Sequence, residues 1–281
     1  MITRGVYSAT CSILNDDYSL NVEDTIQHAV STINKGLHGA IFFGSTSQSQ
    51  LIDLNSKKSL ISKIATHKLR KNFFLGTGCN SLNETLELIK YGYEYQFNDF
   101  LIMPPAYYKG NTEEGVYNFY KYLIDNMPKI RIILYNFEKL SSFLFTPQFI
   151  RKLVDDFPKN IVGVKDSSYN LYDNLKIKNF LVFPGSEAKL LKGLKLGCAG
   201  TISAITQVTH SLARKVFDDF ENNKEQLHNE KLIAVREVFD QYNLISALHS
   251  YFSIKNKNFK ILLPPLIFLE SNETKNLMKK L

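Results

Sequence analysis

The sequence predicts an α/β protein, a (β/α)₈ TIM barrel followed by a C-terminal helical extension. Eight short apolar runs recur along the first 203 of 281 residues. They are rich in β-branched and aromatic residues, and most do not alternate apolar with polar residues. Strands that are buried on both faces of a parallel sheet have this pattern. Amphipathic segments with helical spacing separate them. Eight β/α units in about 200 residues favour a closed barrel, and a doubly wound open sheet is the alternative.

The expected strands and helices follow from these patterns. The strands are residues 5–10, 39–43, 73–77, 99–103, 130–135, 161–165, 180–183 and 199–203. Helices are expected at 22–35, 83–91, 146–155 and 186–196. Thr146 and Pro147 have the residue types that favour the N-cap and the first position of a helix, which places the start of the third one.

The chain after residue 207 shows no further clear strand. Its pattern indicates helices at 213–222 and 227–242, and a loop at Leu262-Leu263-Pro264-Pro265. We therefore expect a barrel over residues 1–207 and a C-terminal helical extension of the same domain over 208–281.

Composition excludes several classes of protein. Hydrophobic residues make up 44% of the chain and charged residues 22%, as in an ordinary folded protein. No apolar run reaches the 18 or so residues of a membrane span, and the first residues lack the layout of a signal peptide. A cytoplasmic location is therefore expected, without a membrane partner. The three cysteines, Cys11, Cys79 and Cys198, fit no disulfide or metal framework and are expected to be small buried hydrophobes.

The net charge of +7 raises the question of nucleic-acid binding. The positive charge comes from 28 lysines and only 6 arginines, whereas phosphate and base recognition favours arginine. The lysines are scattered, and no nucleic-acid-binding motif accompanies them. We interpret the charge as a solvated surface and expect no nucleic-acid partner.

The active site of a barrel forms where its strands end at their carboxyl side. Lys165 stands at such an end, after the apolar run Ile161-Val162-Gly163-Val164. A buried lysine is costly unless its amine has a partner or a task. Burial favours the neutral amine, which can attack a ketone to form an imine. The alternative is a lysine that reaches solvent or pairs with Asp166.

Two neighbouring strand ends carry groups that suit such chemistry. Tyr135 ends the preceding strand, and a phenol beside an imine-forming lysine can carry protons. Taken alone, Tyr135 is better interpreted as a packed barrel tyrosine. Ser45 and Thr46 follow a glycine at a strand-to-loop turn, where hydroxyl and backbone N–H groups can bind a carboxylate. A plain polar turn is the alternative there.

Six segments in order resemble the dihydrodipicolinate synthase and N-acetylneuraminate lyase family. Gly44-Ser45-Thr46 resembles its carboxylate motif, and Tyr135-Asn136 resembles the Tyr-Asn that carries the catalytic phenol. Gly163-Val164-Lys165-Asp166-Ser167-Ser168 is similar to its Schiff-base lysine motif. The other three segments are Pro104–Lys109, Pro184–Glu187 and Ala199–Ala204.

The resemblance implies a class I aldolase or lyase that needs no cofactor and no metal. Lys165 would attack the keto carbon of pyruvate, and the resulting enamine would add to an aldehyde, or the reverse cleavage would occur. Ser45, Tyr135 and Tyr108 would form a proton relay, with Tyr108 supplied by a neighbouring subunit of a dimer or tetramer. Ser45 and Thr46 would hold the pyruvate carboxylate, and Gly185 and Ile202 would line the keto acid.

Two departures from the family pattern bear on the substrate. Leu140 occupies the position at which dihydrodipicolinate synthases resemble one another in having an arginine. Lys139 could substitute for that arginine only as a point charge, without its bidentate fork. Ser47-Gln48 occupies the positions of the Gly-Glu that usually follows the threonine in the family motif. If that turn needs a positive φ, Ser47 would be strained there. A hydroxyl-rich pocket from Ser167, Glu187 and Gln207 would suit a 2-keto-3-deoxy sugar acid.

Three functions remain in contention from the sequence. The first is a lyase for a 2-keto-3-deoxy sugar acid or a similar hydroxy keto acid. The second is 4-hydroxy-tetrahydrodipicolinate synthase, which condenses pyruvate with aspartate semialdehyde. The third is a barrel that binds a keto acid without catalysis, which the departures at Ser47-Gln48 and Leu140 motivate.

Overall fold

The computed structural model describes all residues from 1 to 281 and contains one sheet of eight parallel strands. The strands are β1 (Gly5–Ala9), β2 (Gly39–Phe42), β3 (Phe73–Gly76), β4 (Asp99–Ile102), β5 (Arg131–Asn136), β6 (Ile161–Asp166), β7 (Leu181–Pro184) and β8 (Gly200–Ser203). Each agrees with an expected strand to within about two residues, because all eight are apolar runs buried along nearly their whole length.

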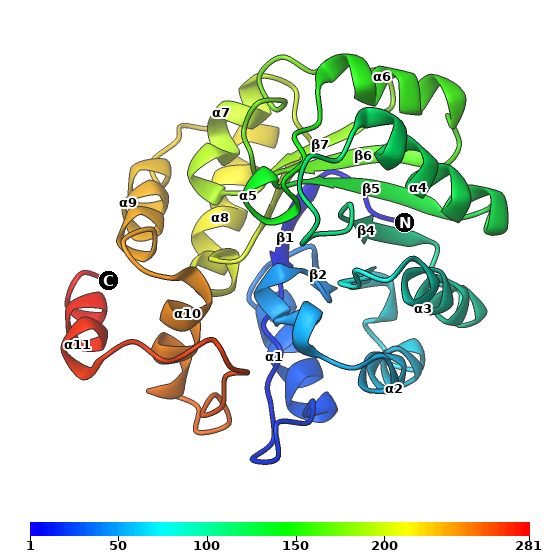
Figure 1. The fold of residues 1–281 in the computed structure, drawn as a ribbon. Helices are drawn as coiled ribbons and strands as arrows, with labels where there is room; N and C mark the ends of the chain where they lie inside the picture. Colours follow the sequence, from blue (N-terminus) through cyan, green and yellow to red (C-terminus); the bar gives the residue numbers. More distant parts are fainter.

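The sheet closes on itself as a barrel (Figure 1). Its order is β7-β6-β5-β4-β3-β2-β1-β8, so β1 pairs with both β2 and β8. Between β7 and β8, Ala199 N–H donates to the Val182 carbonyl at 2.8 Å. The Thr201 hydroxyl donates to the Pro184 carbonyl at 2.7 Å. These contacts join the two ends of the sheet, so the (β/α)₈ barrel is confirmed over the open doubly wound sheet.

Helices cover the outside of the barrel, except for α5, which lies beside the cavity at the strand ends, and for the helices of the C-terminal extension. The helices of the chain are α1 (Val22–Asn34), α2 (Leu54–Ala65), α3 (Leu82–Glu94), α4 (Glu113–Asn126), α5 (Glu138–Ser141), α6 (Pro147–Asp156), α7 (Leu190–Lys195), α8 (Thr206–Glu221), α9 (Asn229–Phe239), α10 (Leu244–Ser253) and α11 (Ser271–Lys279). Thr146 caps α6, because its hydroxyl accepts the Phe149 N–H at 3.1 Å, and Pro147 opens the helix as predicted. Short 3₁₀ turns lie at Ser45–Ser47, Ser49–Leu51, Arg70–Asn72 and Glu187–Lys189.

The C-terminal part begins beside the last barrel helix. The expected boundary after residue 207 falls inside α8, whose buried Ala213 and Val216 pack with Val6 of β1. Helix α8 thus covers the barrel, and α9 to α11 follow it along one side of the molecule (Figure 1). Phe239 and Leu248 of these helices pack against Ile205, the N-cap residue of α8 just after β8, and this contact joins the extension to the barrel.

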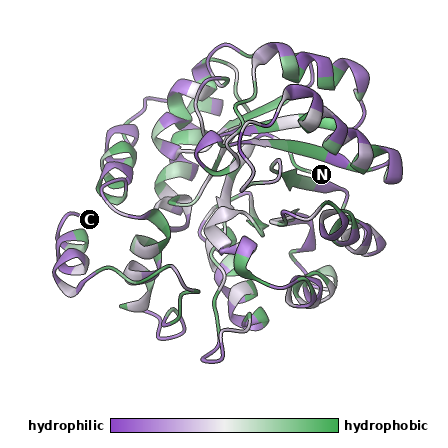
Figure 2. Cartoon of the chain, in the orientation of Figure 1, coloured by the Kyte–Doolittle hydropathy of each residue, from purple (hydrophilic) through white to green (hydrophobic).

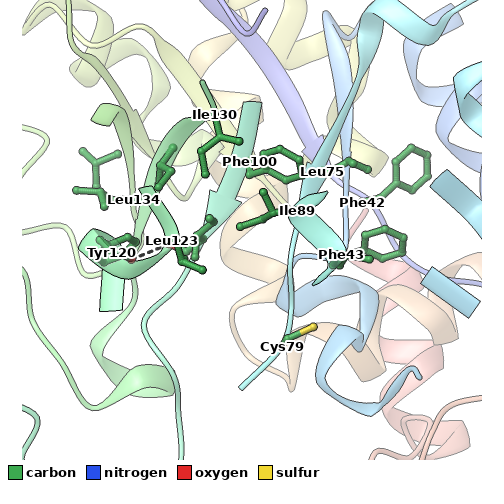
Figure 3. Close-up of a cluster of buried hydrophobic side chains, with 14 of the residues drawn as sticks. Phe42, Phe43, Leu75, Cys79, Ile89, Phe100, Tyr120, Leu123, Ile130 and Leu134 are labelled. Carbon is green, nitrogen blue, oxygen red and sulfur yellow. Dashed lines mark hydrogen bonds between the residues drawn. The ribbon is translucent and has the colours of Figure 1, made fainter. Parts of the chain in front are cut away.

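The hydrophobic core has two layers. Inside the barrel, eleven buried residues form one cluster, which includes Tyr7, Phe74, Tyr135, Phe183 and Ile202. Outside it, 41 buried residues fill the space between strands and helices, and Figure 3 shows part of that cluster between β3, β4 and their helices. The helices carry their polar residues outward and the strands are largely apolar (Figure 2), as burial of one helical stripe requires.

A glutamine joins the C-terminal segment to the barrel. After β2, Phe43 at φ 60° and Gln48 at φ 55° lie in the left-handed region, whereas Ser47 lies within the 3₁₀ turn, so the strain considered for Ser47 does not arise. The side-chain oxygen of Gln48 accepts the Leu263 N–H at 2.8 Å. Its amide nitrogen lies 3.5 Å from His249 Nε2. The loop that follows β2 is therefore fixed by residues more than 200 positions away.

Two buried histidines should make the fold sensitive to acid. Burial lowers the pKa of His249 from 6.5 to about 3, assisted by the nearby His28, and burial lowers the pKa of His28 to about 4. Because the unfolded chain takes up these protons near pH 6.5, stability is full above that pH. The contribution of each histidine to the free energy of unfolding is lost as the pH falls from about 6.5 toward its folded pKa, which is about 4 for His28 and about 3 for His249. At pH 5 the loss is about 2 kcal/mol for each histidine.

We expect His249→Phe to reduce this pH dependence, because a phenyl ring fits among Phe259 and Phe268 and takes up no proton. The denaturant midpoint at pH 7 and pH 5 measures the effect, with His228→Phe as the control at a partly exposed site. If the denaturant midpoint fell equally between pH 7 and pH 5 in both variants and in the unchanged protein, His249 would not be a source of the pH dependence.

Candidate active site

Lys165 lies at the carboxyl end of β6 with its side chain in the barrel. Only 3% of the residue is exposed, and its register partner on β5 is Tyr135. The amine Nζ lies 4.2 Å from the centre of the Tyr135 ring. It forms no hydrogen bond and no ion pair within the chain, and the side chain lines a cavity. The amine is therefore positioned to meet a small molecule.

The neighbouring carboxylate is fully engaged elsewhere. Asp166 accepts hydrogen bonds from Asn136 Nδ2 at 2.8 Å and from the backbone N–H groups of Tyr169, Leu171 and Tyr172, each at 2.9 Å. Burial raises the pKa of Asp166, and these bonds oppose the rise. Asp166 holds the loop after β6 in place, so the alternative of a Lys165–Asp166 pair is wrong.

Tyr135 and Ser45 form a hydroxyl pair beside the lysine. The phenol oxygen of Tyr135 lies 2.9 Å from Ser45 Oγ, and either atom can be the donor. Tyr135 comes from the end of β5, and Ser45 opens the 3₁₀ turn after β2. The first N–H groups of such a turn have no acceptor within it, so those of Ser45 and Thr46 are available to an anion.

A cavity of about 600 Å³ gathers most of the expected site residues. It is lined by Ser45, Thr46, Tyr135, Phe137, Glu138, Lys139, Lys165, Ser167, Ser168, Tyr169, Gly185, Ala204, Arg236, Asp240 and Leu244. Gly185 leaves room at this wall, since a Cβ there would lie 2.1 Å from Ser167 Oγ. A smaller cavity of about 110 Å³ shares Ser45 and Tyr135 and includes Leu140 and Cys79.

Four expected site residues lie elsewhere. Gln207 lines neither cavity, because its buried side chain accepts the Cys11 N–H and donates to the Ala9 and Ala204 carbonyls. Tyr108 is 75% exposed and lines neither cavity of its own chain. Ile202 is fully buried in the cluster inside the barrel. Glu187 is also fully buried and lies behind the cavity wall.

The structure adds an arginine that sequence reasoning did not place in the site. Arg236 of α9 lines the large cavity, and its Nη1 lies 3.4 Å from Glu187 Oε2. Its Nε donates to Asp240 at 2.8 Å. Ser203 donates to the same Glu187 oxygen, while Glu187 Oε1 has no partner. Burial raises the pKa of the Glu187 carboxyl, and the Arg236 charge opposes that rise.

The local sequence gave no signal for Arg236. It lies in an ordinary amphipathic helix, 71 residues after Lys165, and its pairing with Asp240 has the common i,i+4 spacing of a solvated helix face. Only the packing of α9 against the turn at Glu187–Lys189 brings it to the cavity.

Two further properties concern the chain as a whole. No group of three or more His, Cys, Asp or Glu side chains is arranged to hold a metal ion. None of the helices has both the length and the apolar character to cross a bilayer.

Comparison with known proteins gives the family. A model of the dihydrodipicolinate synthetase family matches residues 2–281. A 4-hydroxy-tetrahydrodipicolinate synthase of Methanothrix thermoacetophila is 26% identical over 97% of this chain and 94% of its own. A 2-dehydro-3-deoxy-D-gluconate/2-dehydro-3-deoxy-phosphogluconate aldolase of Picrophilus torridus is 26% identical over 76% of this chain and 81% of its own.

Solved structures show the same fold. A prophage protein of the dihydrodipicolinic acid synthase family from E. coli K12, crystallised with pyruvate, superimposes with a TM-score of 0.88 at 19% identity. The match covers 99% of this chain and 97% of that one. With the family match over almost the whole length, the chain belongs to the dihydrodipicolinate synthetase family, whose members are lyases.

Proposed function

We propose that this protein is a metal-independent class I aldolase that makes or cleaves a C–C bond of a 2-keto acid through a Schiff base on Lys165. The observation that carries the proposal is the free, buried amine of Lys165 beside the Tyr135–Ser45 hydroxyl pair, at the wall of a cavity of about 600 Å³. A cavity of that volume accommodates a small substrate with several polar groups.

The chemistry begins with the lysine. Its neutral amine attacks the keto carbon of pyruvate, and loss of water from the carbinolamine gives an imine. The protonated imine withdraws electrons from the adjacent methyl group, so a methyl proton leaves and an enamine forms. The enamine carbon then attacks an aldehyde, and hydrolysis of the new imine releases the product and Lys165. Cleavage follows the same steps in reverse.

Tyr135 carries out the proton transfers at the carbinolamine. Its phenol can pass a proton to Ser45 over 2.9 Å. The backbone N–H groups of Ser45 and Thr46 would hold the carboxylate of the keto acid, in line with the family resemblance. Tyr108 is exposed and lines neither of the two cavities of its own chain. We propose that it extends the relay of a neighbouring subunit in a homo-oligomer, which would complete each site.

The remaining wall of the cavity favours a polyhydroxy substrate. Ser167, Ser168 and Tyr169 supply hydroxyl groups, while Glu187 and Asp240 neutralise Arg236. Hydroxyl groups of a 2-keto-3-deoxy sugar acid can both donate to and accept from such a surface. A second substrate carboxylate instead needs a fixed, unpaired cation, and besides Lys165 the cavity offers only Lys139, a point charge on a flexible side chain.

The second candidate, 4-hydroxy-tetrahydrodipicolinate synthase, is favoured by one observation. Arg236 places a guanidinium in the cavity, although Leu140 of α5 occupies the position where an arginine was expected. If a substrate carboxylate displaced Asp240 from Arg236, aspartate semialdehyde would be bound after all. A comparison of kcat/KM for the two substrates decides between the candidates.

The Schiff base itself is tested by trapping. Incubation with pyruvate and borohydride is expected to add a reduced pyruvyl group to Lys165, detected by intact mass and by peptide mapping. Lys165→Ala should give no adduct, and Lys139→Ala, which removes the other cavity lysine, should still give it. Absence of the adduct, or its persistence in Lys165→Ala, would overturn the proposal.

A barrel that binds a keto acid without turnover would form the adduct too. Turnover is therefore measured with a panel of hydroxy keto acids for cleavage and aldehydes for condensation. We expect at least one substrate with a kcat in the usual range of about 1–10³ s⁻¹. An adduct with no turnover across the panel would favour the binding function.

A further inference from the structure

Lys57 of α2 is a buried cation without a carboxylate. The residue is 2% exposed and forms no ion pair, unlike Lys58 beside it, which pairs with Glu87. Its Nζ donates to the carbonyls of Thr77 and Gly78 at 3.3 and 2.9 Å. The third neighbour is Cys79 Sγ at 3.4 Å. Buried lysines generally have a carboxylate partner, so a lysine held against a thiol is an unusual arrangement.

Cys79 differs from the other two cysteines of the chain. Cys11 and Cys198 lie in apolar surroundings, where burial raises the thiol pKa to about 12 and about 11. Burial also raises the pKa of Cys79, but the charge of Lys57 opposes it. No second cysteine lies beside Cys79, and all three thiols are free. The amine of Lys57 is therefore its nearest reactive group.

An oxidant the size of water can reach this pair. Cys79 lines the small cavity that holds Ser45 and Tyr135, and together with Lys57 it lines a neighbouring cavity of about 480 Å³. Figure 3 shows Cys79 at the margin of the hydrophobic cluster, below Phe43 and the end of β3. The two buried groups are thus accessible from the cavity side.

We propose that Lys57 and Cys79 form an oxidative cross-link, in which one oxygen atom bridges Nζ and Sγ. One molecule of hydrogen peroxide converts the thiol to a sulfenic acid and releases one water. A second peroxide oxidises the pair of Nζ–H and sulfenic O–H, forming the N–O bond and releasing two waters. Sulfur and nitrogen each lose two electrons, and the two peroxides accept all four. Nζ and Sγ lie 3.4 Å apart. An oxygen bridge requires the two atoms to move closer by less than a direct nitrogen–sulfur bond would.

The cross-link would join α2 to the loop after β3. That loop, Thr77 to Cys79, includes Gly78 at φ 55° and forms part of the small cavity beside Ser45 and Tyr135. A covalent tie there restricts a wall of the site, and reduction by a thiol would release it. The inference concerns the redox chemistry of this wall and does not depend on the proposed reaction.

The test is mass spectrometry of the full-length protein after treatment with hydrogen peroxide. We expect a gain of about 14 Da, for one oxygen added and two hydrogens lost, located in a linked pair of peptides that contain Lys57 and Cys79. Dithiothreitol should reverse it. Lys58→Met should retain the link, whereas Lys57→Met and Cys79→Ser should lose it.

A different oxidation pattern would overturn the inference. Successive gains of about 16 Da on Cys79, with Lys57 in a free peptide, would mean that the thiol oxidises alone. Equal oxidation of Cys11 and Cys198 would mean that the pair has no special reactivity. Because the unchanged protein gives the result, the test does not depend on whether the variants fold.

Discussion

Tyr135→Phe is expected to lower kcat by about 10²- to 10⁴-fold, the range for loss of a general acid–base group. The phenol oxygen is the only proton-carrying group of that side chain, and it lies 2.9 Å from Ser45 Oγ beside the Lys165 amine. The ring remains, so its packing in the barrel cluster and its contact with Lys165 are kept. The KM should change much less than kcat, and the adduct with pyruvate should form more slowly.

A matched control lies in the same cluster. Tyr7 of β1 also packs inside the barrel, but its hydroxyl donates to the Thr3 carbonyl at 2.9 Å, before β1 begins. Tyr7→Phe removes a phenol of equal size away from the cavity and should leave kcat within about threefold. If both variants lost activity equally, the effect would be structural and Tyr135 would not be the proton carrier.

The second large effect concerns the choice of substrate. We expect kcat/KM for cleavage of a 2-keto-3-deoxy sugar acid to exceed that for condensation of pyruvate with aspartate semialdehyde by roughly a thousandfold. A substrate carboxylate would meet Leu140 in one cavity and, in the other, an arginine already neutralised by Asp240 and Glu187. The remaining cation beside it, Lys139, is a point charge without the bidentate fork of an arginine, so it does not fix a carboxylate in the same way. Leaving a carboxylate without a partner costs several kcal/mol, about three powers of ten.

The Arg236 environment can be changed to test this reason. Asp240→Asn removes the more exposed of its two carboxylates and should raise kcat/KM for aspartate semialdehyde relative to the sugar acid. Asp218→Asn breaks the equivalent i,i+4 pair with Arg214 on α8 and should leave the ratio unchanged. An aspartate-semialdehyde value above about 10⁴ M⁻¹s⁻¹ in the unchanged protein, within the normal enzyme range, would show that the cavity already recognises that carboxylate.

The sequence by itself determined the barrel and the lysine. The eight apolar runs correspond to the eight strands, because a strand buried on both faces consists of consecutive apolar residues. Thr146-Pro147 indicated the start of α6, because capping is a local interaction. Lys165 could be placed at a strand end for the same reason. The cysteines, predicted to be buried, are buried, since each lies in or beside an apolar segment.

The tertiary structure alone decided what surrounds that lysine. Asp166 turned out to be engaged by the backbone of its own loop, which leaves the amine free. Arg236 entered the cavity from a helix beyond the barrel, and Lys57 met Cys79 from 22 residues away. The contacts of Arg236 and Lys57 depend on how whole helices pack against strand ends, and each involves residues far apart in the chain. Local periodicity reports which face of an element is buried, but it carries no information about which distant side chain will share that space.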